Sequence, residues 1–143
     1  MVPLAYIPPM PNYWILKTEP STYSFDNLVK AGTDVWDGVA NPVALRNLRS
    51  MTPGDQVMVY HTGDEKAIVG LATVASEPRP DPKNPKLVVV DLKAGSPIAR
   101  PVTLAAVKAD PAFADLALVR QGRLSVVPVA ALLWKRLVAM GTE

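Results

Sequence analysis

The stretch QVMVYHTGDEKAIVGLATVAS, residues 56–76, contains two apolar, β-branched runs separated by a short polar segment. Runs of this composition are typical of strands, and a short polar segment between them favours a hairpin turn. We therefore predict strands over Gln56–His61 and Ala67–Ser76, joined by a turn at Thr62–Lys66.

Upstream of this hairpin, the sequence predicts one strand and two short helices. Tyr13–Lys17 (YWILK) has the β-branched and aromatic residues that strands favour. Asn41 and Pro42 indicate a helix start, because Asn caps free amides and Pro suits the first helical position. This helix should stop before Thr52, and the earlier one should cover Phe25–Lys30, with Ser24 as its cap and Gly32 beyond its end.

Downstream, Lys86–Lys93 (KLVVVDLK) predicts a strand after a proline-rich loop. Helix starts are expected at Thr103 and Asp110, a strand at Leu124–Val127, and a terminal helix after Pro128. Fifteen prolines divide the chain into short elements. The expected fold is α+β: a mixed, partly closed β-barrel of about five to six strands, with short helices packed around it.

Composition limits the classes of function. The 143 residues are 49% hydrophobic, which suits one globular domain. The chain has no cysteine and one histidine, which excludes disulfides, thiolate zinc sites and multi-histidine metal sites, and fits a reducing, cytoplasmic location. No metal or cofactor is therefore expected. A net charge of +2 permits a polyanionic partner without demanding one, and no apolar run reaches the ~20 residues of a membrane span.

Residues 1–11 (MVPLAYIPPMP) are apolar, contain four prolines and lack a basic segment. This composition does not fit a signal peptide, so we expect a flexible tail followed by one domain over residues 12–143. Translation could begin at Met1 or at Met10, since the first strand pattern starts just after Met10.

The sequence lacks the usual catalytic motifs. It has no Gly-rich dinucleotide or phosphate loop, no Gly-x-Ser-x-Gly and no His-Glu-x-x-His. A Ser-His-Asp triad could use only His61, and a lone histidine at a strand end is more often a hydrogen-bonded structural residue. We therefore assign no catalytic residue and predict a protein that is not an enzyme.

Three clusters of polar and aromatic residues fall at strand ends and in loops, where binding residues tend to lie. A base-binding pocket needs an aromatic wall, donors and acceptors for the base edge, and cations for phosphate, and the clusters contain all of these types. Each also has a structural interpretation, namely a turn, core packing or a solvated edge. The clusters are Lys17–Pro20, Trp36–Val39 with Asn41, and Tyr60–His61 together with Arg120–Ser125.

The order and spacing of several motifs resemble the EVE domain family from about Asn12 to Gly141. These motifs are YWILKTEPSTYSFDNL, VWDGVANPVALRNLRSMTPGD, VYHTGDEKAIVG, PVTLAAVKADPAFADLALVRQGRLSVVPV and LLWKRLVAMG. The family is similar in fold to PUA, YTH and ASCH domains. The resemblance therefore implies a PUA-like mixed barrel with a concave site that receives a base from RNA or DNA, and a role in reading modified bases.

By position, the resemblance implies a ligand site lined or bordered by Lys17, Thr18, Trp36, Asp37, Gly38, Asn41, Tyr60, His61, Arg120 and Ser125. Trp36 is the first choice for the wall on which a base stacks. Many relatives read Arg-Asn-Tyr-Gln-Ala-Arg where this chain reads Ala40–Leu45, so two cations and an aromatic are missing. Arg46, Arg49 and Arg123 are the expected phosphate contacts in their place.

The expected function is a non-catalytic, monomeric nucleic-acid-binding module that holds a modified base such as 5-methylcytosine, in RNA or DNA. One alternative is a small-molecule-binding or protein-interaction domain that uses the same pocket. Another is a small enzyme with His61 or Asp37 as general base. Salt dependence separates the first two, because binding to phosphates weakens steeply with salt and binding in an apolar pocket does not.

Overall fold

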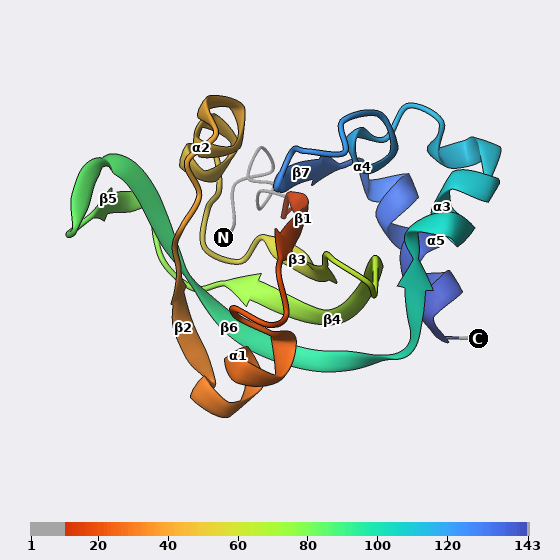
Figure 1. Cartoon of the computed structure of the whole chain (residues 1–143), viewed down its shortest axis with the longest axis horizontal. Helices are drawn as coiled ribbons and strands as arrows, with labels where there is room; N and C mark the ends of the chain where they lie inside the picture. Colours follow the sequence, from red (N-terminus) through yellow and green to blue (C-terminus); the bar gives the residue numbers. More distant parts are fainter. Residues whose placement is uncertain (1–10, 143) are drawn as a thin grey trace, which may run out of the picture.

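The computed structural model describes residues 11–142, so the expected tail lies, except for Pro11, outside the described residues. Figure 1 shows the arrangement of the elements. No described helix is long and apolar enough to cross a bilayer. The elements are β1 (Tyr13–Thr18), α1 (Phe25–Ala31), β2 (Thr33–Trp36), α2 (Pro42–Arg49), β3 (Gln56–His61), β4 (Ala67–Val74), β5 (Arg79–Asp81), β6 (Asn84–Thr103), α3 (Leu104–Ala109), the 3-10 turn η1 (Pro111–Phe113), α4 (Ala117–Arg120), β7 (Val126–Val129) and α5 (Ala131–Thr142).

The described strands form one mixed, seven-stranded sheet in the order β2-β6-β4-β3-β1-β7, with β5 also paired to β6. β1 runs parallel to β3, and the other pairs are antiparallel. The α+β class is confirmed, but the partly closed barrel is not, because β2 and β7 lie at opposite ends of the strand order. Helix α2 packs against both β6 and β7. A helix, rather than pairing between strands, therefore connects the two ends of the sheet.

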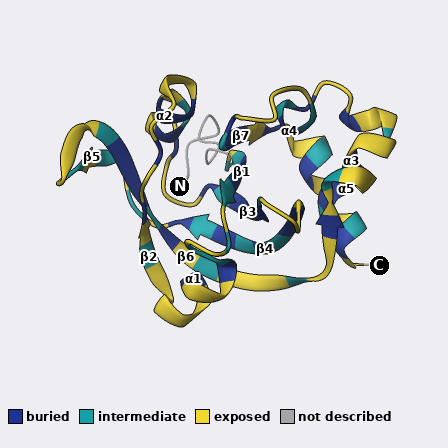
Figure 2. Cartoon of the chain, in the orientation of Figure 1, coloured by how far each residue is buried: buried dark blue, intermediate teal, exposed yellow. Residues whose placement is uncertain are grey.

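The centre of the sheet is the most deeply buried part of the molecule (Figure 2). β3 lies between β1 and β4, and its residues from Val57 to His61 are all buried. β4 alternates between buried and partly exposed residues over most of its length, which is typical of a strand with one face in the core. β1 pairs with this centre directly, whereas β7 is joined to it through β1 and β2 through β6.

Two strands were not predicted from the sequence. β2 (TDVW) is short and begins with polar residues, and β5 (RPD) lies inside the stretch that was expected to be a proline-rich loop. β6 continues well past Lys93, the expected strand end, because shifts in its register to β4 accommodate Gly95 and Pro97. β7 includes Pro128. A proline is tolerated there because β7 is an edge strand, at the end of the strand order.

Candidate functional site

A cavity of about 540 Å³ opens where the ends of β1 and β2 meet the residue before β7. β1 and β7 are antiparallel, with Leu16 opposite Val126, so the end of β1 lies beside Ser125. The backbone N–H of Lys17 donates to the carbonyl of Ser125 at 3.0 Å and continues this pairing. We call this cavity the pocket, and six of the residues expected in the site line it: Lys17, Thr18, Trp36, Asp37, Gly38 and Ser125.

Tyr23 and Trp36 form the aromatic part of the pocket wall. Their rings meet edge to face, with centroids 6.1 Å apart and planes at 89°. Trp36 is only 6% exposed, so most of its ring packs in the core and a small part reaches the pocket. The core-packing and ligand-wall interpretations of Trp36 therefore both apply to the same side chain.

Tyr23 was missed by the sequence analysis, although it is held firmly in the pocket. Its hydroxyl donates to Asp34 Oδ2 at 2.5 Å, and its carbonyl accepts a 2.7 Å bond from the Thr18 hydroxyl. Burial, the bond to Asp34 and the charges of Asp34 and Asp37 raise the pKa of Tyr23 to about 12. An aromatic residue in a polar loop just before a helix cap was the one available signal.

The pocket lining is rich in carboxylates. Glu19, Asp34 and Asp37 all contribute to it, against the single cation of Lys17. Asp37 is exposed and makes no hydrogen bond or ion pair with another described residue, so its oxygens are open to a ligand. Carboxylates accept hydrogen bonds only, and this lining therefore suits a ligand that presents donors.

Lys17 is constrained by its surroundings. Its Nζ donates to the carbonyl of Gly122 at 2.9 Å and lies 5.6 Å from the centre of the Tyr60 ring. Burial lowers the pKa of Lys17. Tyr60 itself is buried beneath this ammonium group and does not line the pocket.

Three other expected site residues lie outside the pocket lining because each is engaged elsewhere. Asn41 caps α2, with its Oδ1 accepting from the backbone N–H groups of Val43 and Ala44. Arg120 forms an exposed ion pair with Asp115 at 2.9 Å. The third residue is His61.

His61 is buried at 7% exposure and connects β3 to the start of α1. Its Nε2 accepts the backbone N–H of Phe25, the first residue of α1, at 3.0 Å. This contact requires an unprotonated Nε2, so the proton of the neutral ring lies on Nδ1, which donates to Glu65 Oε2 at 3.1 Å. Both ring nitrogens are therefore occupied within the protein, as in a structural histidine.

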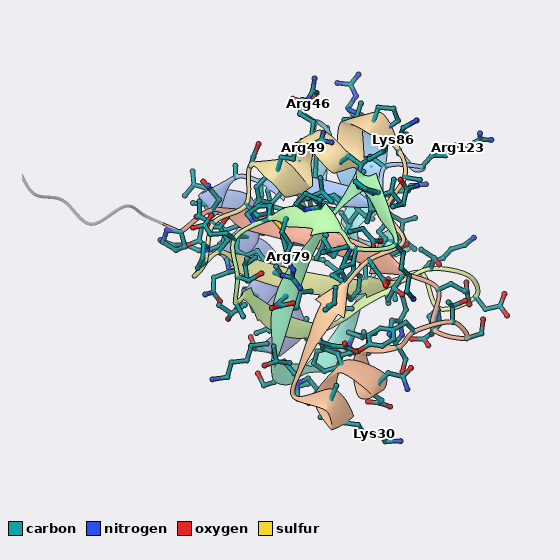
Figure 3. The ribbon with its side chains drawn as sticks, turned by 90° about the vertical axis from the view of Figure 1, so that its left-hand side faces the viewer. Lys30, Arg46, Arg49, Arg79, Lys86 and Arg123 are labelled. Carbon is teal, nitrogen blue, oxygen red and sulfur yellow. The ribbon has the colours of Figure 1, made fainter. Side chains whose placement is uncertain are left out.

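The three arginines expected to contact phosphate are exposed and form no ion pair with a described acidic residue. Arg46 and Arg49 lie on α2, which begins three residues after the pocket residue Val39. Arg123 precedes the pocket residue Ser125 by two positions. In Figure 3 the side chains of Arg46 and Arg123 extend away from the body of the molecule.

A second hollow, of about 610 Å³, lies where the start of β1 meets β7. It is larger than the pocket, but no charged residue lines it, and its lining includes Asn12, Tyr13, Ser50 and Val129. The pocket combines aromatic rings with convergent charged groups, which is the arrangement typical of specific ligand sites. We therefore regard the pocket as the candidate site.

Comparisons with known proteins agree with this architecture. Thymocyte nuclear protein 1 of Rattus norvegicus is 34% identical over 82 residues, which cover 49% of this chain and 36% of the rat protein, just over a third of its length. A solved structure from Rhodopseudomonas palustris is 46% identical, with a TM-score of 0.86 over 91% of this chain and 92% of that chain.

The human THYN1 protein, solved in complex with 5-methylcytosine-containing DNA, is 25% identical, with a TM-score of 0.84 over 92% of this chain and 98% of that chain. The family model of the EVE domain matches residues 12–140, which include every residue of the pocket. The chain therefore belongs to the EVE domain family.

Proposed function

We propose that this domain is a non-catalytic nucleic-acid-binding module whose pocket holds a single base, with a preference for a modified base such as 5-methylcytosine. The observation that carries the proposal is the open pocket itself, where aromatic rings and an unpartnered carboxylate, Asp37, face the same space. The similarity to a human protein solved with 5-methylcytosine-containing DNA supports it.

The size and lining of the pocket suit a base. Its volume of about 540 Å³ lies within the range typical of small-ligand pockets. Trp36 and Tyr23 offer aromatic surface for contact with the base. A carboxylate accepts a hydrogen bond from the exocyclic amino group of cytosine, a group that uracil and thymine lack. Asp37 is the side chain that supplies this acceptor.

The base must reach the pocket from a single strand or be extruded from a duplex, which costs a few kcal/mol. Contacts between phosphates and Arg46, Arg49 and Arg123 help to offset this cost, since these cations lie beside the pocket in the sequence and have no acidic partner among the described residues. The cytoplasmic location and the monomeric state stay predictions from the sequence, which does not distinguish RNA from DNA.

The enzyme hypothesis has less support. His61 uses both ring nitrogens in contacts with Phe25 and Glu65, so it has no free nitrogen to act as a general base. Asp37 lies in the pocket, but no described histidine, serine or lysine side chain forms a hydrogen bond with it. These contacts favour binding over proton transfer as the role of the site.

A small-molecule ligand is the second candidate, and the carboxylates of the pocket favour it. Glu19, Asp34 and Asp37 repel the phosphate of a nucleotide but not an uncharged or cationic ligand. An uncharged ligand would bind with little dependence on salt. A cationic ligand would bind more weakly at high salt.

The test is binding of matched fluorescent oligonucleotides, unmodified or carrying 5-methylcytosine, 5-hydroxymethylcytosine or N6-methyladenine, as RNA and as DNA, at two salt concentrations. We expect salt-dependent binding that prefers one modification, by about four-fold if one buried methyl group is the sole difference. Trp36→Ala should weaken binding about five- to 150-fold, the loss of one stacked base.

Failure of every oligonucleotide to bind would contradict the proposal and favour a small free ligand. If the Trp36→Ala variant bound the preferred oligonucleotide with the affinity of the wild type, Trp36 would not stack on the base. The proposal of nucleic-acid binding would still hold. Thermal unfolding of the variant is the necessary control, because most of the Trp36 ring lies in the core.

A further inference from the structure

The hairpin formed by β5 and the start of β6 projects from the body of the molecule (Figure 1). Its turn is fixed by two local bonds: the N–H of Lys83 donates to Asp81 Oδ1, and the N–H of Lys86 donates to Asn84 Oδ1. Prolines at positions 80, 82 and 85 restrict the backbone further. The hairpin is thus a defined element whose two lysine side chains are exposed to solvent.

Lys83 and Lys86 form no ion pair with a described acidic residue. The nearest acidic residue in the sequence, Asp81, already accepts the Lys83 amide, and Asp91 is bound by Arg79 at 2.9 Å. Cations of one sign gathered on a surface attract an anionic partner through their summed field. Lys83 and Lys86 contribute little to the stability of the fold, because they have no ion-pair partner among the described residues.

The hairpin continues the cationic surface of α2. Helix α2 packs against β6, and the segment from residue 39 to residue 54 contains no acidic residue. Figure 3 shows Arg46, Arg49, Lys86 and Arg123 toward the same end of the molecule and Lys30 toward the opposite end, and Figure 1 places α2 between the hairpin and the loop that carries Arg123. We call Arg46, Arg49, Lys83, Lys86 and Arg123 the basic surface.

The hairpin and the pocket differ in charge. No residue of the hairpin lines the pocket, and the pocket lining carries three carboxylates against one lysine. A single nucleotide in the pocket has one phosphate group, which cannot contact α2, the loop at Arg123 and the hairpin together. Only an anion that extends from the pocket over the surface can do so.

We propose that the β5–β6 hairpin is a second contact for the phosphodiester backbone, and that the ligand is an extended nucleic-acid strand rather than a free nucleotide. This inference rests on the proposed function. The base occupies the pocket, α2 and Arg123 hold the adjacent phosphates, and Lys83 and Lys86 hold phosphates farther along the strand. Phosphate contacts of this kind position the chain without reading its sequence.

The experiment compares Lys83→Ala/Lys86→Ala with the control Lys30→Ala/Lys108→Ala. Both variants lose two positive charges from exposed lysines, but Lys30 lies in the last turn of α1 and Lys108 lies on α3, both away from the hairpin. The probes are a short DNA duplex with one central 5-methylcytosine and the free nucleoside 5-methyl-2′-deoxycytidine. Thermal unfolding verifies that both variants remain folded.

We expect the hairpin variant to bind the duplex more weakly and to lower the slope of log K against log salt by about two, because each phosphate contact contributes about 0.9 to the slope. Its affinity for the nucleoside should not change. The control variant should keep the wild-type slope.

Equal slopes for the wild type and the hairpin variant, with duplex binding intact, would overturn the inference alone. A wild-type protein that binds the nucleoside and not the duplex would overturn it together with nucleic-acid binding. Loss of binding to phosphatidylserine vesicles in the hairpin variant, with duplex binding unchanged, would assign the hairpin to a membrane surface and also contradict the inference.

Discussion

Two aspartates show how differently this domain uses the same side chain. Asp55 is 1% exposed, and its carboxylate accepts four hydrogen bonds: from the Asn12 N–H and the Thr52 hydroxyl at Oδ1, and from the Trp14 indole N–H and the Thr52 N–H at Oδ2. Asp37 lies exposed in the pocket and has no such bond to a described residue.

The difference indicates which polar groups serve the fold and which are left for a ligand. At the Asp55 cluster, defined by Asn12, Trp14, Thr52 and Asp55, the chain satisfies its own buried donors, as stable interiors require. In the pocket, an acceptor and part of an aromatic ring stay open to solvent. Incomplete satisfaction in a concave, rigid place is the physical reason for regarding the pocket as the binding site.

The largest expected effect is on stability and follows from removing the Asp55 carboxylate. Asp55→Ala leaves the Trp14 indole N–H and two backbone N–H groups without an acceptor, at about 1–3 kcal/mol each. We therefore expect a loss of at least about 3 kcal/mol in the free energy of unfolding, measured by urea denaturation.

Asp37→Ala is the matched control, with an expected change within about 0.5 kcal/mol, as for an exposed residue without partners. The Asp37→Ala substitution should instead affect binding of the preferred oligonucleotide. Similar losses of stability in both variants would break the distinction between the cluster and the pocket.

A smaller loss of stability is expected for His61→Ala, because the Phe25 N–H at the start of α1 then lacks its acceptor. We predict about 1–3 kcal/mol, again by urea denaturation. Glu65→Gln, which alters only the half-exposed partner of His61, should change stability by less than about 0.5 kcal/mol. Weaker oligonucleotide binding by a fully folded His61→Ala protein would contradict the structural role and return His61 to the binding site.

Much of the fold follows from local patterns, and what the sequence analysis missed depends on distant contacts. The caps at Ser24 and Asn41 are correct because capping depends on a few neighbouring residues. β2 forms because Trp36 pairs with Val90, more than fifty residues away, and no local pattern reports this contact. The same limit applies to sheet closure, since a helix at the open side of a sheet leaves no signal in strand periodicity.

The site residues show the same difference between local patterns and distant contacts. The residues at the ends of β1 and β2 were expected in the pocket, and Lys17 and Asp37 lie in its lining. His61 was expected there as well, but its ring turns toward α1, and this orientation depends on the long-range contact with Phe25. Tyr23 was missed because its role depends on Asp34, which reaches it from β2, a strand that the sequence analysis did not predict.

The smallest expected effect is a pH dependence at Tyr23. Its pKa is raised in the folded protein to about 12, above the ordinary value of 10.0, so the neutral hydroxyl favours the folded state. This contribution is fully present below pH 10.0 and is lost as the pH rises through about 12. The difference in unfolding free energy between the wild type and Tyr23→Phe should therefore shrink over this range.

Spectrophotometric titration of tyrosinate in both proteins provides the check on this assignment. The wild type should show one more late-titrating tyrosine than the Tyr23→Phe variant. A wild-type protein in which Tyr23 ionises near the ordinary value would show that the bond to Asp34 is absent in solution, and the pocket wall would then be less rigid than described.

The most direct test of the central claim is to map the bound base by NMR, following the amide and indole signals of the labelled protein during titration with a 5-methylcytosine-containing DNA oligonucleotide. The account predicts the largest shifts at the Trp36 indole and at the amides of Tyr23, Asp37 and Gly38, with small shifts at the Asp55 cluster. Shifts centred on Tyr13 and Val129, in the second hollow, with an unchanged Trp36 indole signal, would contradict it.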